Sequence, residues 1–196
     1  MQMKILALLS GGIDSAVACY IMLRRGCSVE YLHFSMGSAS VNKAIRLASK
    51  LKEYGGSGRI FVIPHSRLIE LVPKDRYTCV YCKRGMLSIA EMLAEKIGCA
   101  ALLTGDSLGQ VASQTIPNLR AEDAAVRIPV LRPLIGFDKD EIIGIAKEIG
   151  TYEISIEKGD ECSAVPKNPV TKAKLSEIKP VNVSGLVELV EEIKID

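Results

Sequence analysis

Leu8-Leu9-Ser10-Gly11-Gly12-Ile13-Asp14-Ser15 is the stretch that decides the fold of this chain. It follows an apolar run, residues 5–9, that is typical of a buried strand, and it precedes residues 16–23, which are typical of a helix. A glycine pair between strand and helix lets the backbone turn sharply and approach a ligand closely. The first turn of the helix then presents unpaired N–H groups and a positive dipole end, which together bind anions such as phosphate.

Asp14 is the unusual residue of this turn, because a carboxylate beside phosphate is repulsive unless it binds a cation or orients a donor. A Mg²⁺ ion would remove the conflict, since Mg²⁺ is commonly held by one or two carboxylates together with phosphate oxygens. The loop has no Lys after its second glycine, so it is not a Walker A loop. We expect a phosphate and Mg²⁺ site formed by Ser10, Gly11, Gly12, Asp14 and Ser15. A plain glycine turn before a helix is the alternative.

The composition describes one globular domain. The chain has 196 residues, of which 48% are hydrophobic and 24% charged. No apolar run is long enough to span a bilayer, and the N-terminal segment does not read as a signal peptide, so we expect a cytoplasmic protein without membrane contact. Six cysteines in that compartment do not indicate a disulfide framework. A net charge of only +2 and the absence of Trp argue against a strongly basic or base-stacking surface.

Apolar runs alternate with helical patterns along most of the chain. The runs that predict strands span residues 4–9, 28–34, 59–64, 100–104 and 127–131, and the helical patterns span residues 13–25, 40–54, 66–72, 83–97 and 138–149. This alternation predicts an α/β fold with a doubly wound, parallel five-stranded sheet. We expect residues 1–180 to form the main domain and residues 181–196 to form a C-terminal amphipathic helix.

Polar clusters follow each predicted strand. They are residues 10–15, residues 35–38, His65, residues 104–107 and Arg132-Pro133. Ligands in such folds bind beyond the carboxyl ends of the strands, so these clusters predict one site at one end of the sheet. His33 lies inside the second strand and is better interpreted as a hydrogen-bonded core residue.

Residues 104–115, Thr-Gly-Asp-Ser-Leu-Gly-Gln-Val-Ala-Ser-Gln-Thr, form a second signature. Gly105 permits close approach of the backbone, and Asp106 and Ser107 suit the cap of a helix that runs to about residue 115. We therefore expect a second helix N-terminus aimed at the same site.

Two resemblances give these motifs a chemical meaning. Ser-Gly-Gly-x-Asp-Ser resembles the PP-loop of the ATP pyrophosphatases, whose fold is adenine nucleotide alpha hydrolase-like. Residues 104–115 resemble the 4-thiouridine tRNA sulfurtransferase family, called ThiI. The similarity continues through residues 132–139, 141–143, 149–156 and 166–171, so it covers nearly the whole chain.

The resemblance implies that ATP adenylates the O4 atom of a tRNA uridine with release of pyrophosphate, and that sulfur then displaces AMP. By this likeness the 10–15 loop holds pyrophosphate and magnesium, with Asp14 and Asp106 as catalytic residues. The remaining implied ligands are Phe34 and Met36 at the adenine, Gly105, Asp106, Ser107 and Gln110 at the nucleotide or target base, and Arg132 at a phosphate.

Cys79 and Cys82 form a C-x-x-C pair, and Cys162 lies far downstream. Such a pair binds a metal or forms a redox couple, and the adjacent Lys83 and Arg84 with the following helix predict lowered thiol pKa values. Archaeal-type relatives suggest that the three cysteines hold an iron–sulfur cluster with one open iron. A persulfide on Cys162, a structural zinc and three unconnected thiols are the alternatives, in that order.

Typical members of the family carry an RNA-binding region before the glycine turn, and others use a rhodanese domain. We expect tRNA binding here to need a separate RNA-binding chain or a dimer partner, with a basic stripe of Lys43, Arg46 and Lys50 as a further candidate. A sulfur donor is also expected. Two other functions remain open: thiolation of another tRNA base or a thiamine-pathway acceptor, and a non-catalytic subunit that binds nucleotide and cluster.

Overall fold

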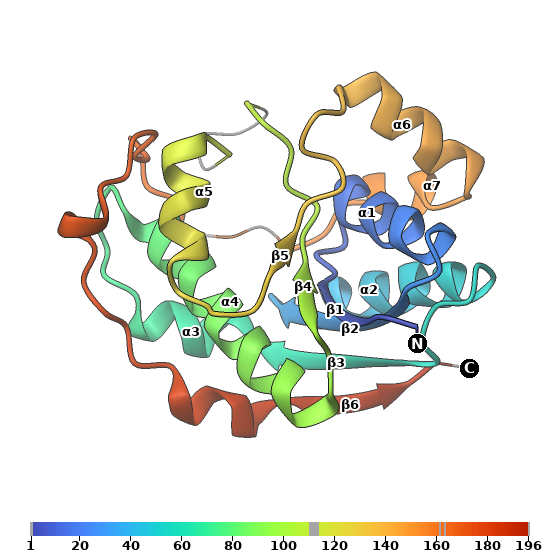
Figure 1. Ribbon diagram of the computed structural model, residues 1–196, viewed down its shortest axis with the longest axis horizontal. Coiled ribbons are helices and arrows are strands. Elements are labelled where there is room, and N and C mark those ends of the chain that lie inside the picture. Colours follow the sequence, from blue (N-terminus) through green and yellow to red (C-terminus); the bar gives the residue numbers. More distant parts are fainter. Residues whose placement is uncertain (1, 110–113, 161, 163, 196) are drawn as a thin grey trace.

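A six-stranded sheet forms the centre of the computed structural model, which describes residues 2–109, 114–160, 162 and 164–195 (Figure 1). Its strand order is β5-β4-β1-β2-β3-β6. The strands are β1 (Lys4–Leu8), β2 (Ser28–Ser35), β3 (Arg59–Pro64), β4 (Ala101–Leu103), β5 (Val130–Leu131) and β6 (Glu191–Lys194). All neighbouring pairs are parallel except β3 and β6. The predicted doubly wound parallel sheet is confirmed, with one strand more than expected.

Helices cover both faces of the sheet (Figure 1). One face carries α1 (Ile13–Arg24), α2 (Ser38–Lys52), α6 (Lys139–Glu148) and α7 (Tyr152–Ile156), and the other carries α3 (His65–Leu71), α4 (Thr78–Ile97) and α5 (Ile116–Asp123). Two 3₁₀ segments, η1 (Leu175–Glu177) and η2 (Ser184–Leu189), lie near the C-terminus. Successive strand side chains point to opposite faces, so Ile5 and Ala7 enter one core while Leu6 enters the other. Among the described residues, no helix is both long and apolar enough to cross a membrane.

The strand order reverses beside β1. The chain passes from β1 to β2 and β3 on one side, and then returns to β4 and β5 on the other side. The loops that follow β1 and β4 therefore leave neighbouring strands at a topological switch point, which is where open α/β sheets bind ligands. This topology brings the glycine turn and residues 104–107 together.

The predicted C-terminal amphipathic helix is wrong. The segment forms η2 and then β6, which pairs antiparallel with β3 and places Ile193 opposite Ile60. Residues 193 and 195 are both isoleucine, and alternation of this kind suits a strand that satisfies the open edge of β3. Leu189 lies in this segment and is 42% exposed.

The prediction of a helix from about residue 106 to residue 115 is also wrong for the residues of this stretch that the structure describes. Residues 104–109 form a loop and a turn, and α5 begins only at Ile116, with Thr115 Oγ1 accepting a hydrogen bond from Asn118 N at 3.4 Å. Asp106 does not cap a helix, because its carboxylate enters the buried ion pairs described below. Gln110 lies outside the described residues.

Replacing Asp138 with alanine is expected to lower the free energy of unfolding by about 1 kcal/mol, the usual loss for an N-cap. Asp138 Oδ1 accepts from Glu141 N at 2.8 Å, and Glu141 Oε2 accepts from Asp138 N at 2.8 Å, which completes a capping box at α6. Urea denaturation measures the loss. Glu148→Ala, an exposed change in the last turn of α6, is the control, and an equal loss in both variants would contradict the assignment.

Candidate active site

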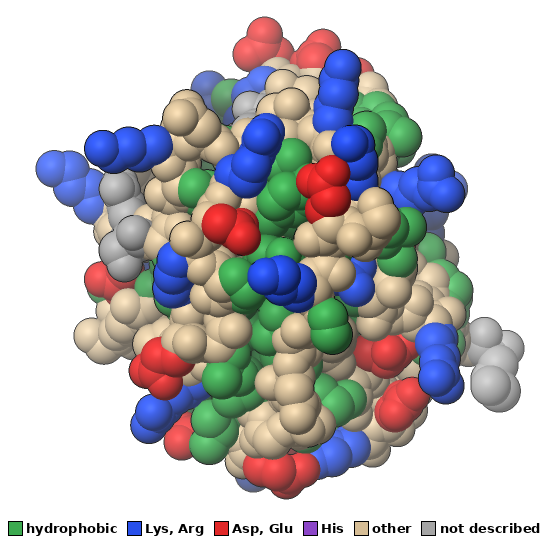
Figure 2. Space-filling view, turned by 90° about the vertical axis from the view of Figure 1, so that its left-hand side faces the viewer, with side chains coloured by type: hydrophobic (Ala, Val, Ile, Leu, Met, Phe, Trp, Pro, Cys, Tyr) green, Lys and Arg blue, Asp and Glu red, His purple; other side chains and the backbone are tan. Residues whose placement is uncertain are grey.

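Two cavities open beside the carboxyl ends of the central strands. The cysteine cavity, of about 280 Å³, is lined by Leu9, Phe34, Met36, His65, Cys79, Cys82 and Cys162 among others. The carboxylate cavity, of about 250 Å³, is lined by Asp14, Ser15, Thr104, Gly105, Asp106, Gln114 and Glu122 among others. Leu8, Ser10, Lys83 and Met86 line both. Figure 2 shows the side toward which β2 and β3 point, where hydrophobic side chains gather in the middle and charged side chains of both signs lie among and around them.

The glycine turn after β1 is held in shape by its own serines. Ser15 Oγ accepts from Ser10 N at 3.1 Å and lies 3.0 Å from Ser10 Oγ, which in turn accepts from Gly12 N at 3.3 Å. Gly11 has φ +84°, a conformation that favours glycine. Gly12 is the N-cap of α1 and provides no side chain, so the first amides of the helix remain available to a ligand. Asp14 in this turn forms an ion pair with Lys139.

Gly105 fixes the distance between the glycine turn and the loop after β4. A Cβ at this position would lie 2.6 Å from Ser15 N and 2.7 Å from the carbonyl carbon of Asp14. No side chain larger than hydrogen fits between these two backbones. The close approach predicted for Gly105 is therefore present, and its neighbour is the N-terminal turn of α1.

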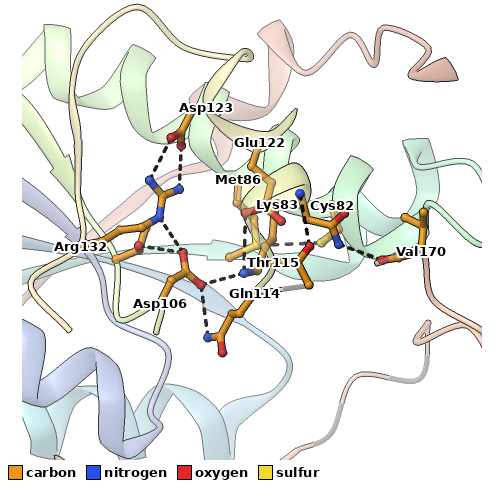
Figure 3. Close-up of polar contacts among 12 residues, drawn as sticks. Cys82, Lys83, Met86, Asp106, Gln114, Thr115, Glu122, Asp123, Arg132 and Val170 are labelled. Atoms are coloured by element: carbon orange, nitrogen blue, oxygen red, sulfur yellow. Dashed lines mark hydrogen bonds and ion pairs between the residues drawn. The ribbon is translucent and has the colours of Figure 1, made fainter. Parts of the chain in front are cut away.

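Asp106 is the centre of a buried charged network (Figure 3). Its carboxylate accepts from Lys83 Nζ at 2.7 Å, from Thr104 Oγ1 at 2.8 Å and from Arg132 Nε at 3.3 Å. Burial alone would favour the neutral acid, but the two cations and the hydrogen bonds hold the pKa of Asp106 below its ordinary value. Arg132 also donates two hydrogen bonds to Asp123, at 3.0 and 2.6 Å. Its guanidinium is thus engaged with carboxylates, and its predicted role at a phosphate stays a prediction.

Glu122 lies next to this network but differs from Asp106 in its partners. The residue is 1% exposed, and its Oε2 atom is 3.8 Å from Lys83 Nζ. Neither carboxylate oxygen has a hydrogen-bond partner among the residues that the structure describes. Burial raises the pKa of Glu122 from 4.5 to about 8, against the opposing effect of Lys83. Glu122 therefore holds its proton to higher pH than an ordinary glutamate does.

Glu122→Gln is expected to change how stability depends on pH. Because the pKa of Glu122 is about 8 in the folded protein and ordinarily 4.5, the folded state binds more protons than the unfolded state between these values. The free energy of unfolding of the wild type therefore falls as pH rises through this window. Glutamine does not titrate, so the variant should gain on the order of 3 kcal/mol relative to the wild type between pH 5 and pH 8. Urea denaturation at both pH values measures this, and parallel pH profiles would contradict the assignment.

The three candidate cysteines line one cavity, but not in the form expected. Cys79 and Cys82 lie in the first turns of α4, which begins at Thr78 rather than at Lys83. Cys162 lines the same cavity from a loop. The predicted lowering of thiol pKa values is wrong for this pair, because burial raises the pKa of Cys82 to about 12 and also raises that of Cys79. Cys82 Sγ lies 3.1 Å from His65 Nε2.

The other predicted ligands are placed as follows. Phe34 and Met36 line the cysteine cavity, as an adenine site there would require. Ser107 is fully buried, and its hydroxyl has no hydrogen-bond partner among the described residues. His33 is a core residue as predicted, with Nδ1 2.8 Å from Leu9 O. The nucleotide roles of these residues stay predictions.

Two members of the site were not identified from the sequence, namely the Lys83–Asp106 ion pair and Glu122. Cys79, Cys82, Lys83 and Met86 follow helical spacing along α4, so a helix predicted from Thr78 would have placed Lys83 on the same face as the cysteines. No comparable signal exists for Glu122. In the sequence it is one of two adjacent acids at the end of a polar helix.

The strand order, the glycine turn after β1 and its contact with the loop after β4 define an α/β protein of the PP-loop class. A family model described as "Thiamine biosynthesis protein (ThiI)" matches residues 1–185, and the chain belongs to this family. A probable tRNA sulfurtransferase of Methanocaldococcus jannaschii is 46% identical over 187 residues, which cover 92% of this chain and 49% of that protein. A probable tRNA sulfurtransferase of Methanothermobacter thermautotrophicus is 47% identical over 179 residues, covering 87% and 46%.

A similar solved structure is that of a 4-thiouridine synthetase in complex with RNA and with bound ATP. It has a TM-score of 0.87 and 36% sequence identity, and the match covers 98% of this chain and 55% of that one. The resemblance noted from the motifs is confirmed. The chain spans about half the length of the curated relatives it matches.

Proposed function

We propose that this chain provides the ATP-dependent catalytic site of a tRNA sulfurtransferase that converts a uridine to 4-thiouridine. The observation that carries the proposal is the match, over 98% of this chain, to a 4-thiouridine synthetase that was solved with RNA and ATP. The arrangement of the two cavities supports it, because a phosphate loop, a buried Asp–Lys pair and three thiols border one another.

The proposed chemistry uses these parts in order. A uridine carbonyl oxygen is a poor leaving group, and its attack on the α-phosphate of ATP turns it into an adenylate with pyrophosphate as the leaving group. The helix N-terminus and the serines of the glycine turn bind the pyrophosphate. Sulfur then adds to the activated carbon and AMP departs. Lys83, held by Asp106, lines both cavities and would stabilise the developing negative charge.

Asp14 suits the Mg²⁺ ion that the reaction is proposed to need. Its carboxylate is partly exposed at the mouth of the anion site, and its ion-pair partner among the described residues is the flexible, exposed side chain of Lys139. Mg²⁺ typically takes one or two carboxylates and phosphate oxygens. When bound, the ion would neutralise charge on the departing pyrophosphate.

The proposed iron–sulfur cluster fits the donor set but not the side-chain positions. Three thiols line one cavity, yet the described residues include no group of three metal-ligating side chains placed to hold an ion. No step of the reaction is therefore assigned to a cluster. Anaerobic reconstitution with iron and sulfide tests it, since Cys79→Ala should lose the cluster absorbance, and a variant that keeps it in full would contradict the assignment.

A separate RNA-binding chain or a dimer partner is the proposed source of further tRNA contacts. The basic stripe on α2 is largely engaged within the chain, because Arg46 forms a bidentate pair with Glu157 and Lys43 donates to the Glu157 carbonyl oxygen. Lys50 pairs with Glu53. A face whose cations are already paired offers less attraction to phosphates, which supports a partner for RNA binding.

The proposed function is tested by incubating the protein anaerobically with ATP, Mg²⁺, sulfide and unmodified tRNA. We expect AMP and 4-thiouridine to form in equal amounts, and Asp14→Asn to form neither. AMP without thiolated tRNA would indicate another acceptor, such as a thiamine-pathway sulfur carrier. No AMP with any acceptor would favour a nucleotide-binding subunit without turnover.

A further inference from the structure

The carboxylate cavity contains buried polar atoms that the described part of the chain leaves without partners. Both carboxylate oxygens of Glu122 and the side-chain oxygen of Gln114 have no hydrogen bond among the described residues. Glu122 is 1% exposed and Gln114 is 8% exposed, so bulk solvent does not compensate. A buried polar atom without a hydrogen bond costs about 1–3 kcal/mol. Three such atoms at one cavity indicate a ligand that supplies their missing hydrogen bonds.

The position of these atoms relative to Lys83 defines what the ligand must offer. Lys83 Nζ donates to Asp106 and lies 3.8 Å from Glu122 Oε2, so a donor stands beside an acceptor. Figure 3 shows Gln114 with its nitrogen toward Asp106 and its oxygen turned away from it. The cavity therefore presents one cationic donor and two groups that accept hydrogen bonds. Its ligand needs an acceptor next to an N–H donor.

Phosphate does not satisfy this pattern, because its oxygens accept hydrogen bonds and would leave the Gln114 side-chain oxygen and an accepting oxygen of Glu122 without a donor. A cytosine edge places an amino group where the Lys83 ammonium requires an acceptor. The uracil edge fits, since its C4 carbonyl accepts a hydrogen bond and its neighbouring N3–H donates one. The cavity borders the glycine turn through Ser10, Asp14 and Ser15, so a base bound there lies beside the proposed phosphate site.

We infer that Glu122 is a specificity-determining residue that accepts a hydrogen bond from N3–H of the acceptor uracil while Lys83 donates to the adjacent carbonyl oxygen. This inference rests on the proposed function and adds the group that selects the base. Adenine also presents a donor beside an acceptor. Adenine has a separate candidate site in the cysteine cavity, against the apolar side chains of Phe34 and Met36. The experiment below distinguishes the two bases.

The test compares Glu122→Met, which removes the hydrogen bond at similar size, with Glu122→Gln, which keeps an acceptor. Kinetics of AMP formation with an unmodified tRNA transcript give the KM for tRNA, and equilibrium titration gives the Kd for ATP. E122M should raise the KM for tRNA roughly tenfold, the loss expected for one buried hydrogen bond. E122Q should recover most of this loss. Glu95→Met, on the exposed surface of α4, is the matched control and should bind tRNA as the wild type does.

Each outcome decides the inference. An unchanged KM for tRNA in E122M overturns it, and so does a weaker Kd for ATP with the KM for tRNA unchanged, which would place adenine at Glu122. Glu122 has no hydrogen-bond partner among the described residues, so an apolar side chain of similar size breaks no hydrogen bond that the structure records. Thermal unfolding checks this, and Glu122→Leu replaces E122M should that variant unfold. A wild type that forms no AMP with tRNA instead overturns the proposed function, and the inference falls with it.

Discussion

Replacing Lys83 with methionine is expected to lower the free energy of unfolding by about 3 kcal/mol and to abolish AMP formation. The Lys83 side chain is 29% exposed and that of Asp106 is 10% exposed, so the pair is largely desolvated. Removing one partner of a buried ion pair typically costs about 3–5 kcal/mol, because the other charge is left uncompensated. Arg132 and Thr104 still contact Asp106, which places the expected loss at the lower end. Guanidinium denaturation measures this loss in the free energy of unfolding.

Lys96→Met is the matched control for this prediction. Lys96 forms an ion pair of the same length with Glu188, but the two side chains are 52% and 72% exposed. Exposed pairs contribute about 0–1 kcal/mol. Equal losses in the two variants would show that the Lys83–Asp106 pair is as well solvated as a surface pair, and the account of the site would then fail.

Replacing Gly105 with alanine is expected to weaken ATP binding at least tenfold and to destabilise the fold by about 2 kcal/mol, within the range for overpacking. The added methyl group would lie 2.6–2.8 Å from backbone atoms of Asp14 and Ser15. Backbone cannot rotate away as a side chain can, so the loop after β4 must separate from the first turn of α1. That turn holds the proposed phosphate site.

Gly144→Ala in α6 provides the comparison, since a Cβ built there meets no atom within 4 Å apart from its own helix backbone and chain neighbours. Alanine in a helix interior is favoured over glycine by about 1 kcal/mol, so this variant should bind ATP normally and unfold at a slightly higher temperature. Normal ATP affinity in Gly105→Ala would show that the contact between the two loops does not matter for the nucleotide.

The sequence was sufficient to predict the five parallel strands, because the signals involved are local. Apolar runs mark these strands and polar residues follow each of them, and parallel strands joined by helices leave few possible topologies. The close approach at Gly105 was predicted on the same basis and is present. The two strongest motifs were predicted to meet at one end of the sheet, and residues of both line the carboxylate cavity.

The remaining features depend on contacts between distant residues. The C-terminal segment has both helical and alternating patterns, and the open edge of β3 decided in favour of a strand. The basic residues beside the C-x-x-C pair suggested reactive thiols, but burial outweighs their charge and raises the pKa of Cys82. Glu122 joins the site only because α5 packs against α4, which no local pattern reveals.

The most direct test of the central claim identifies the products of ATP. The protein is incubated with Mg²⁺, unmodified tRNA, sulfide and ATP that carries one label on the α-phosphate and another on the γ-phosphate. Cleavage between the α- and β-phosphates at the glycine turn predicts that the α label appears in AMP and the γ label in pyrophosphate, with both absent in Asp14→Asn. Labelled ADP and inorganic phosphate, or an Asp14→Asn variant as active as the wild type, would contradict the account.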